Sequence, residues 1–172
     1  MNIFQEMKER VTARQVAERY GLKEKAVELI KNIKNLSTGK LLTFYCLIRQ
    51  IAGAMSLRIS GHPQFVRPLI NPMAQGAAIS KYGEIDKKYE DKIKAAAASM
   101  DNYGNFYGQN LFLASGGVLL ISNTLSDLGY ATTGLEIAKA SVPVAVIAFI
   151  LVMIQNIILD KQLERTFGKG NK

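Results

Sequence analysis

Apolar residues are concentrated in four tracts of the chain, and most of the charged residues lie between these tracts. The tracts are 41–57, 59–80, 111–126 and 140–159. The last contains 20 residues without a formal charge, and about 20 apolar residues carry a helix across a ~30 Å hydrocarbon core. The pattern therefore predicts an all-α, multi-pass helical membrane protein that forms a single domain over residues 1–172.

A buried core helix of a soluble bundle is the alternative reading of each tract. It is weakest for 140–159, because few soluble helices are apolar on every face. It is stronger for 111–126, whose apolar part is short and contains Gly116 and Gly117. Four such tracts in one short chain favour the membrane.

The segments outside the tracts are predicted to form polar or amphipathic helices. Residues 1–40 carry charges throughout and have no continuous apolar run, so they differ from a secretory signal and indicate amphipathic helices. Residues 84–100 predict a polar helix. For the N-terminal helices, a solvated face that packs on a partner explains the pattern equally well.

The distribution of lysine and arginine predicts the orientation in the membrane. Nine lie in 1–40, five in 81–100 and four after Leu159, whereas the loop 127–139 contains only Lys139. Because basic loops stay in the cytoplasm, both termini are predicted to be cytoplasmic. The loop 127–139 is predicted to lie outside.

This orientation requires the chain to return across the membrane within 59–80. That tract contains Pro63, Pro68 and Pro72, and proline interrupts the hydrogen bonding of a helix. Irregular backbone at membrane depth is tolerated only where protein or a water-filled cavity covers it. We therefore predict a broken or re-entrant segment of the kind with which transporters build sites. A Pro-rich loop outside the membrane is the alternative.

Arginines in weakly charged tracts are the first candidates for a site. No Asp or Glu occurs in residues 29–83, and an intramembrane arginine is costly unless it faces a cavity or a partner. Because a guanidinium binds carboxylate or phosphate with two parallel bonds, Arg67 and Arg49 are predicted to bind a small anionic substrate. The alternative is that Asp101 or a second protein chain neutralises them.

Neutral polar residues near these arginines complete the predicted substrate site. They are His62, Gln64 and Asn71 around Arg67, and Asn102, Asn105, Gln109 and Asn110 in a second cluster. The aromatic residues of that cluster fit an interfacial belt equally well. Gly104 and Gly108, four residues apart, allow close helix packing.

The sequence contains no recognisable catalytic, nucleotide or metal motif. His62 is the only histidine and Cys46 the only cysteine, so we expect no enzyme activity, no cofactor and no metal. The net charge of +8 is also typical of proteins that bind nucleic acid. The aromatic-rich stretch 101–112 carries only Asp101 as a charge, so nucleic-acid binding is not predicted.

From Arg19 onward the chain resembles a bacterial membrane family named as one subunit of a two-component 5-oxoproline (pyroglutamate) transporter. The matching stretches are ERYGLKEKA at 18–26, LIRQIAGAMSLRISGHPQFVRPLINPMAQGAA at 47–78, AAASMDNYGNFYGQNLF at 96–112 and SGGVLLI at 115–121. The resemblance implies a multi-pass protein in the lipid bilayer that acts with a second, different membrane subunit. It implies a carboxylate substrate and no catalytic residues.

Members of that family begin with additional hydrophobic helices before the ERYGL string, whereas this sequence starts with charged residues. The difference predicts a truncated, mis-started or divergent version. A structural or regulatory membrane subunit, whose partner carries the substrate site, is the alternative function.

Overall fold

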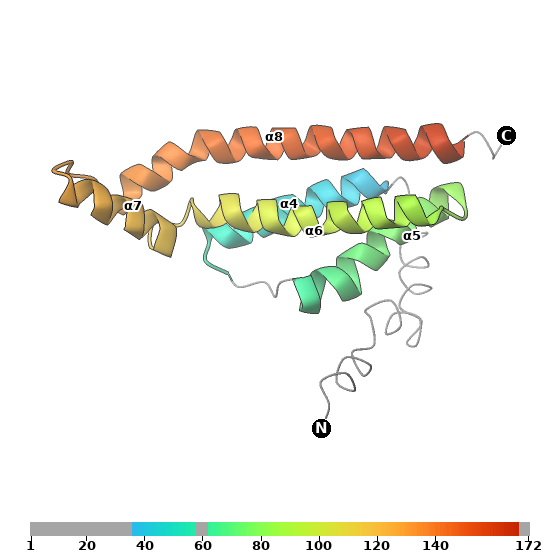
Figure 1. Cartoon of the computed structure of the whole chain (residues 1–172), viewed down its shortest axis with the longest axis horizontal. Coiled ribbons are helices and arrows are strands. Elements are labelled where there is room, and N and C mark those ends of the chain that lie inside the picture. Colours follow the sequence, from blue (N-terminus) through green and yellow to red (C-terminus); the bar gives the residue numbers. More distant parts are fainter. Residues whose placement is uncertain (1–35, 58–61, 169–172) are drawn as a thin grey trace, which may run out of the picture.

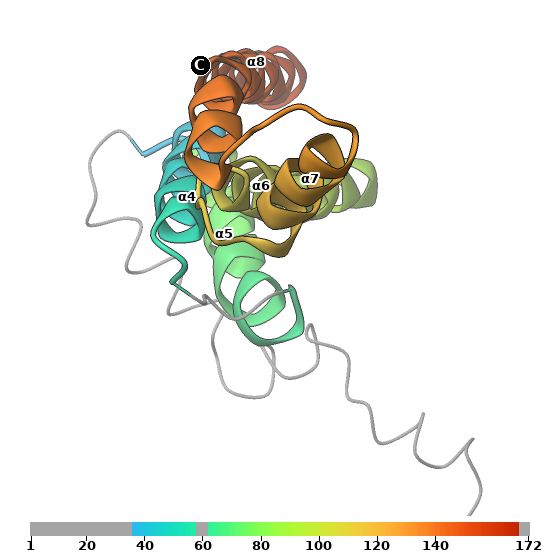
Figure 2. The same ribbon diagram turned by 90° about the vertical axis from the view of Figure 1, so that its left-hand side faces the viewer.

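The described part of the protein is an elongated bundle of helices. The computed structural model describes residues 36–57 and 62–168. Its elements are α4 (Thr38–Ala54), the π-helix η1 (His62–Ile70), α5 (Asn71–Tyr82), α6 (Lys87–Gln109), α7 (Gly116–Asp127) and α8 (Gly134–Phe167). In Figures 1 and 2, α4, α6 and α8 run alongside one another, α5 covers one end of the bundle and α7 lies at the other end. The all-α class is confirmed for these residues, and the amphipathic helices predicted before residue 36 lie outside them.

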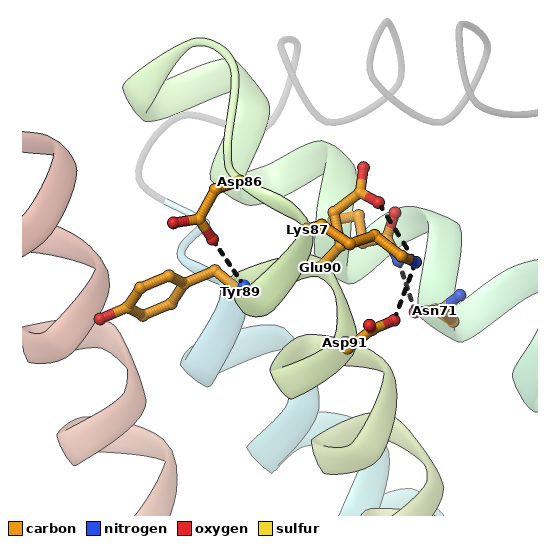
Figure 3. A network of polar contacts seen from close by, with 7 residues as sticks. Asn71, Asp86, Lys87, Tyr89, Glu90 and Asp91 are labelled. Carbon is orange, nitrogen blue, oxygen red and sulfur yellow. Dashed lines mark hydrogen bonds and ion pairs between the residues drawn. The ribbon is translucent and has the colours of Figure 1, made fainter.

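Side chains at the helix starts explain where the main helices begin. Ser37 precedes α4 and its hydroxyl accepts a hydrogen bond from the Lys40 amide. Asp86 does the same for α6 by accepting from the Tyr89 amide at 2.9 Å (Figure 3). Thr133 and Glu136 form a reciprocal capping box at the start of α8. Each cap satisfies an amide that has no partner within the helix.

The predicted polar helix 84–100 is longer in the structure and includes most of the polar cluster after it. α6 begins at Lys87 and continues to Gln109. Figure 3 shows its first turn, where Lys87 Nζ lies 3.0 Å from Asp91 Oδ1 and 4.0 Å from Glu90 Oε2. α6 therefore runs the length of the bundle.

The predicted membrane segment 111–126 forms only a short helix. α7 has 12 residues, or about 18 Å at 1.5 Å per residue, which is shorter than a hydrocarbon core of ~30 Å. Residues 111–115 form turns before it. Ser115 caps its start, since the Ser115 hydroxyl accepts a hydrogen bond from the Val118 amide over 3.3 Å.

The predicted tract 140–159 lies within the longest described helix. α8 has 34 residues, and among the described helices it alone is long and apolar enough to cross a membrane. Only 22% of its most apolar stretch is buried. It buries a single stripe, which consists of Ala138, Ala145, Val152, Asn156, Leu159 and Leu163. The chain is thus a membrane-compatible helical protein, and the multi-pass arrangement stays a prediction.

The Pro-rich tract 59–80 is helical where the structure describes it. η1 spans His62–Ile70 in π geometry and continues into α5 without a loop, so the alternative of a Pro-rich loop is wrong for these residues. Pro68 lies inside η1 and has no amide to donate, whereas Pro72 lies in the first turn of α5, where no bond is lost. The helix type changes within this tract, and a broken or re-entrant course through a membrane stays a prediction.

Glycines allow α4 and α6 to approach closely, as the spacing of Gly104 and Gly108 predicted. A Cβ atom at Gly104 would lie 2.7 Å from Arg49 Cβ and 2.9 Å from the Cys46 carbonyl oxygen. A Cβ at Gly53 would lie 3.0 Å from the Gln109 amide nitrogen. The two helices therefore pack backbone to backbone along their crossing.

Basic residues from distant parts of the sequence meet at one end of the bundle. The start of α4, the end of α5, the start of α6 and the end of α8 lie together there (Figure 1). They carry Lys40, Lys81, Lys87 and Lys161. The described basic residues therefore lie at one end of the bundle, and the predicted orientation in a membrane stays a prediction.

Candidate functional site

Arg49 is buried between α4 and α6, where Asp101 neutralises it. The Arg49 residue is 7% exposed, and its Nε donates to Asp101 Oδ1 over 2.8 Å. The Tyr45 hydroxyl donates to the same oxygen over 2.6 Å. The structure therefore shows the alternative reading of Arg49, an internal ion pair with Asp101.

The sequence contained a signal for Asp101 that the prediction used only for the alternative. Asp101 is the only acidic residue between Asp91 and Asp127, and it begins the polar cluster that follows. An isolated carboxylate among uncharged residues needs a cation or several donors when it is buried. Arg49 and Tyr45 satisfy that need, at four-residue spacing on one face of α4.

The ring of Tyr45 connects this ion pair to the π-helix η1. Phe65 stacks on Tyr45 with ring centroids 5.9 Å apart and an interplanar angle of 27°. Val66, the next residue, is 2% exposed. One face of η1 is thus anchored to the core beside Asp101.

Arg67 lies on the exposed part of η1. Its side chain is exposed, as is that of Gln64. Within residues 36–57 and 62–168, none of the ion pairs involves Arg67. The two arginines of the prediction therefore differ: Arg49 is paired and buried, whereas Arg67 presents a cation on the π-helix.

The predicted amide residues are divided between two places. Asn102, Asn105 and Gln109 occupy successive turns on one face of α6, next to the buried face that holds Asp101. Asn71 lies at the start of α5, where Gln75 Nε2 donates to its side chain over 3.0 Å. Asn110 follows the end of α6.

Asn102 follows Asp101 directly, whereas the Gln109 amide nitrogen lies beside Gly53 of α4. His62 begins η1, and its side chain lies outside the described features.

A polar residue inside the apolar tract 140–159 was missed by the sequence analysis. Asn156 is 1% exposed, and its Nδ2 donates to Thr43 Oγ1 over 3.0 Å and to Met100 Sδ over 3.3 Å. Its Oδ1 has no hydrogen-bond partner among the described residues. Asn156 joins α8 to α4 and α6 in the interior, which its charge-free surroundings in the sequence do not reveal.

A groove of about 970 Å³ lies between α4, α5 and α8. It is lined by Leu36, Ser37, Gly39, Lys40, Thr43, Phe44, Leu47, Ala77, Ser80, Lys81, Tyr82, Phe149, Met153, Ile157, Asp160, Lys161 and Glu164. None of the predicted substrate-binding residues lines it. Its residues come from three separate segments, so no motif in the sequence could have identified it.

The described residues contain no cluster of three or more His, Cys, Asp or Glu side chains that could hold a metal ion. The expectation that the protein uses no metal and no cofactor stays a prediction.

Comparison with known proteins identifies a family without an assigned activity. Residues 11–164 match the family described as "Protein of unknown function (DUF969)". No curated protein matches the chain. No solved structure matches it either.

Proposed function

Since the chain belongs to the DUF969 family, whose description names no activity, we propose from its own residues that it is a subunit of a membrane transporter for a small carboxylate. The candidate substrate is 5-oxoproline, which carries one carboxylate and a lactam. The proposal includes a second, different membrane subunit and a bacterial inner-membrane location with both termini cytoplasmic. It includes no catalytic step.

The apolar exterior of the bundle supports the membrane location. On α8 the exposed large side chains include Ile147, Leu151, Ile154 and Ile158, and on α4 they include Phe44 and Ile51. An apolar surface of this extent favours lipid or a protein partner as its surroundings, because contact between apolar side chains and water is unfavourable. α8 has the length and composition of a membrane span.

The observation that carries the proposal is the position of Arg67. It lies on a π-helix interrupted by Pro68, it is exposed, and no described carboxylate pairs with it. π-Helical segments occur frequently at functional sites, and a guanidinium is suited to a carboxylate. Arg67 is therefore the anion-binding group of the proposal, with Gln64 on the same segment as an amide donor for the lactam.

Arg49 has a different role in the proposal. Its guanidinium is held by Asp101, and Tyr45 links that pair to η1 through Phe65. Arg49 and Asp101 are positioning residues that hold the π-helix in place.

Uptake of labelled 5-oxoproline by cells that express this chain with its second subunit tests the proposal. Arg67→Gln removes the charge and is expected to raise KM at least tenfold, because a charge-assisted bidentate contact contributes about 1.5–3 kcal/mol. Arg67→Lys keeps the positive charge but cannot form two parallel bonds, so its KM is expected to lie between those of the unmodified protein and Arg67→Gln. Lys88→Gln, an exposed lysine on α6, is the matched control and should leave KM unchanged.

A second candidate function is a structural or regulatory membrane subunit whose partner holds the substrate. The exposure of Arg67 and Gln64 favours it, because small-molecule sites bury most of their ligand and an open surface does not. An unchanged KM in Arg67→Gln, with uptake still dependent on this chain, selects this second function and excludes Arg67 from the site.

A further inference from the structure

The groove between α4, α5 and α8 has a charged end and an apolar wall. The charged end contains Lys81, Lys161, Asp160 and Glu164, with the hydroxyl of Ser80. The apolar wall lies farther along α4 and α8 and consists of Phe44, Leu47, Phe149, Met153 and Ile157. From Lys161 to Phe149 the wall extends along α8 for about 18 Å at 1.5 Å per residue.

One of the two carboxylates in the groove is already engaged by the protein. Asp160 Oδ2 accepts from the Ser37 hydroxyl over 2.6 Å, and its Oδ1 accepts from the Gly39 amide over 2.8 Å. These bonds tie the end of α8 to the start of α4 and satisfy the first free amides of that helix. Asp160 is thus part of the wall of the groove.

Lysines from three separate helices meet at the charged end. Lys40, Lys81 and Lys161 line the groove together with Asp160 and Glu164, and Asp160 already accepts from Ser37 and Gly39. The hydrogen bond with Tyr82, and then the nearby Glu164 and Asp160, raise the pKa of the Lys81 ammonium. Lys81 also lies 4.9 Å from the centroid of the Tyr82 ring, so its ammonium is held at the rim.

The apolar wall is exposed and continuous with the outer surface of the bundle. Phe44 is 64% exposed, Met153 39% and Ile157 47%. The groove therefore opens onto the surface that the proposed function places against lipid. Its charged end is the end where the basic segments meet (Figure 1), which the positive-inside rule assigns to the cytoplasmic leaflet. That leaflet carries anionic lipids.

We propose that this groove binds one anionic phospholipid, whose phosphate lies between Lys81 and Lys161 and whose acyl chain lies along Phe44, Phe149 and Met153. The charge at one end and the apolar wall match the two parts of that molecule, since basic pockets between helices on the cytoplasmic side bind anionic headgroups. This inference rests on the membrane location in the proposed function and not on the identity of the transported substrate.

Lipid binding to the purified full chain tests the proposal independently of uptake. The protein is placed in nanodiscs of phosphatidylcholine with increasing phosphatidylglycerol, and retained lipid is measured by native mass spectrometry. Lys81→Gln with Lys161→Gln is expected to weaken phosphatidylglycerol binding by about 25-fold, from about fivefold per lysine near an anionic surface. The matched control is Lys88→Gln with Lys94→Gln, two exposed lysines of α6 outside the groove, which should retain the lipid.

Three results would overturn the proposal. Equal losses in the two double variants would indicate a general attraction of charge. Equal retention of phosphatidylcholine would mean that the groove does not recognise an anionic headgroup. Displacement of the lipid by an equal concentration of glycerol 3-phosphate would mean that the acyl chain contributes nothing to binding. The groove would then bind free phosphate esters. If the unmodified protein binds the lipid but its cells take up no 5-oxoproline, the result contradicts only the proposed transport function.

Discussion

Two side chains, Arg49 and Tyr45, compensate the buried charge of Asp101 in the interior of the bundle. Arg49 and Tyr45 both donate to Asp101 Oδ1, and Arg49 and Asp101 are 7% and 4% exposed. Attraction between two buried charges mainly offsets the cost of taking them out of water. The pair therefore adds little stability beyond an apolar core, but it is costly to break from one side.

Removal of one charge from this pair is expected to destabilise the protein strongly. Asp101→Asn leaves Arg49 buried without a counter-charge, which costs about 3–5 kcal/mol. Thermal unfolding in detergent measures the loss as a fall in Tm. Asp127→Asn, at the end of α7, removes an acidic residue outside the interior and should leave Tm unchanged.

The double variant Arg49→Met with Asp101→Leu separates neutralisation from packing. Apolar residues of similar volume can replace a buried ion pair without net loss, so its Tm is expected to exceed that of Asp101→Asn. A double variant as unstable as the single one would contradict this account of the pair.

The close crossing of α4 and α6 determines the architecture at the scale of elements. Small residues at the crossing bring the backbones together, and Arg49 extends across Gly104 to reach Asp101. The crossing thus creates both the helix packing and the buried pair. The same proximity places the last turns of α6 beside the last turns of α4, at the end away from the basic residues (Figure 1).

A methyl group at Gly104 is expected to separate these helices. The new Cβ would lie 2.7 Å from Arg49 Cβ and 2.9 Å from the Cys46 carbonyl oxygen, so the backbone of α4 must move. Overpacking of this kind costs about 1–3 kcal/mol, and Tm should fall in Gly104→Ala. Gly116→Ala is the control, because a Cβ there would meet nothing within 4 Å. Equal Tm values in the two variants would show that the crossing has room to relax.

At the scale of the whole molecule, α4 and α6 run parallel to each other and α8 runs antiparallel to both, which separates basic from uncharged surfaces. The basic ends lie together, and α7 and the turn before α8 lie at the opposite end (Figures 1 and 2). Exposed large apolar side chains lie between these ends on α4 and α8. This polarity along the bundle has the form that the positive-inside rule predicts for a membrane protein.

Labelling of single cysteines in intact cells tests this orientation. On a Cys46→Ser background, a cysteine at Tyr130, in the turn before α8, is expected to react with a membrane-impermeant maleimide. A cysteine at Lys88, in the first turn of α6, is expected to react only after lysis. Both positions are exposed in the structure, so access to the reagent is the only difference. Labelling of both positions in intact cells would exclude the proposed topology.

Local patterns predicted the helices whose signals lie in consecutive residues. The uncharged run 140–159 predicted the apolar part of α8, and the spacing of Gly104 and Gly108 predicted a close helix contact. Predictions failed where a helix start or end depends on a turn: 111–126 shortened to α7, and α6 continued into the polar cluster. The ends of the predicted helices were placed by charge and polarity alone. These criteria fail because a helix with a narrow buried face can carry polar residues over the rest of its surface.

The amino-acid sequence by itself determined the helical class and the long apolar helix, because each depends on residues that are neighbours in the chain. Only the tertiary structure decided which arginine is neutralised. Asp101 is 52 residues from Arg49, and no local rule relates them. The groove was likewise decided by packing, since its lysines come from three helices. Side chains distant in sequence become partners only when the helices that carry them are packed together.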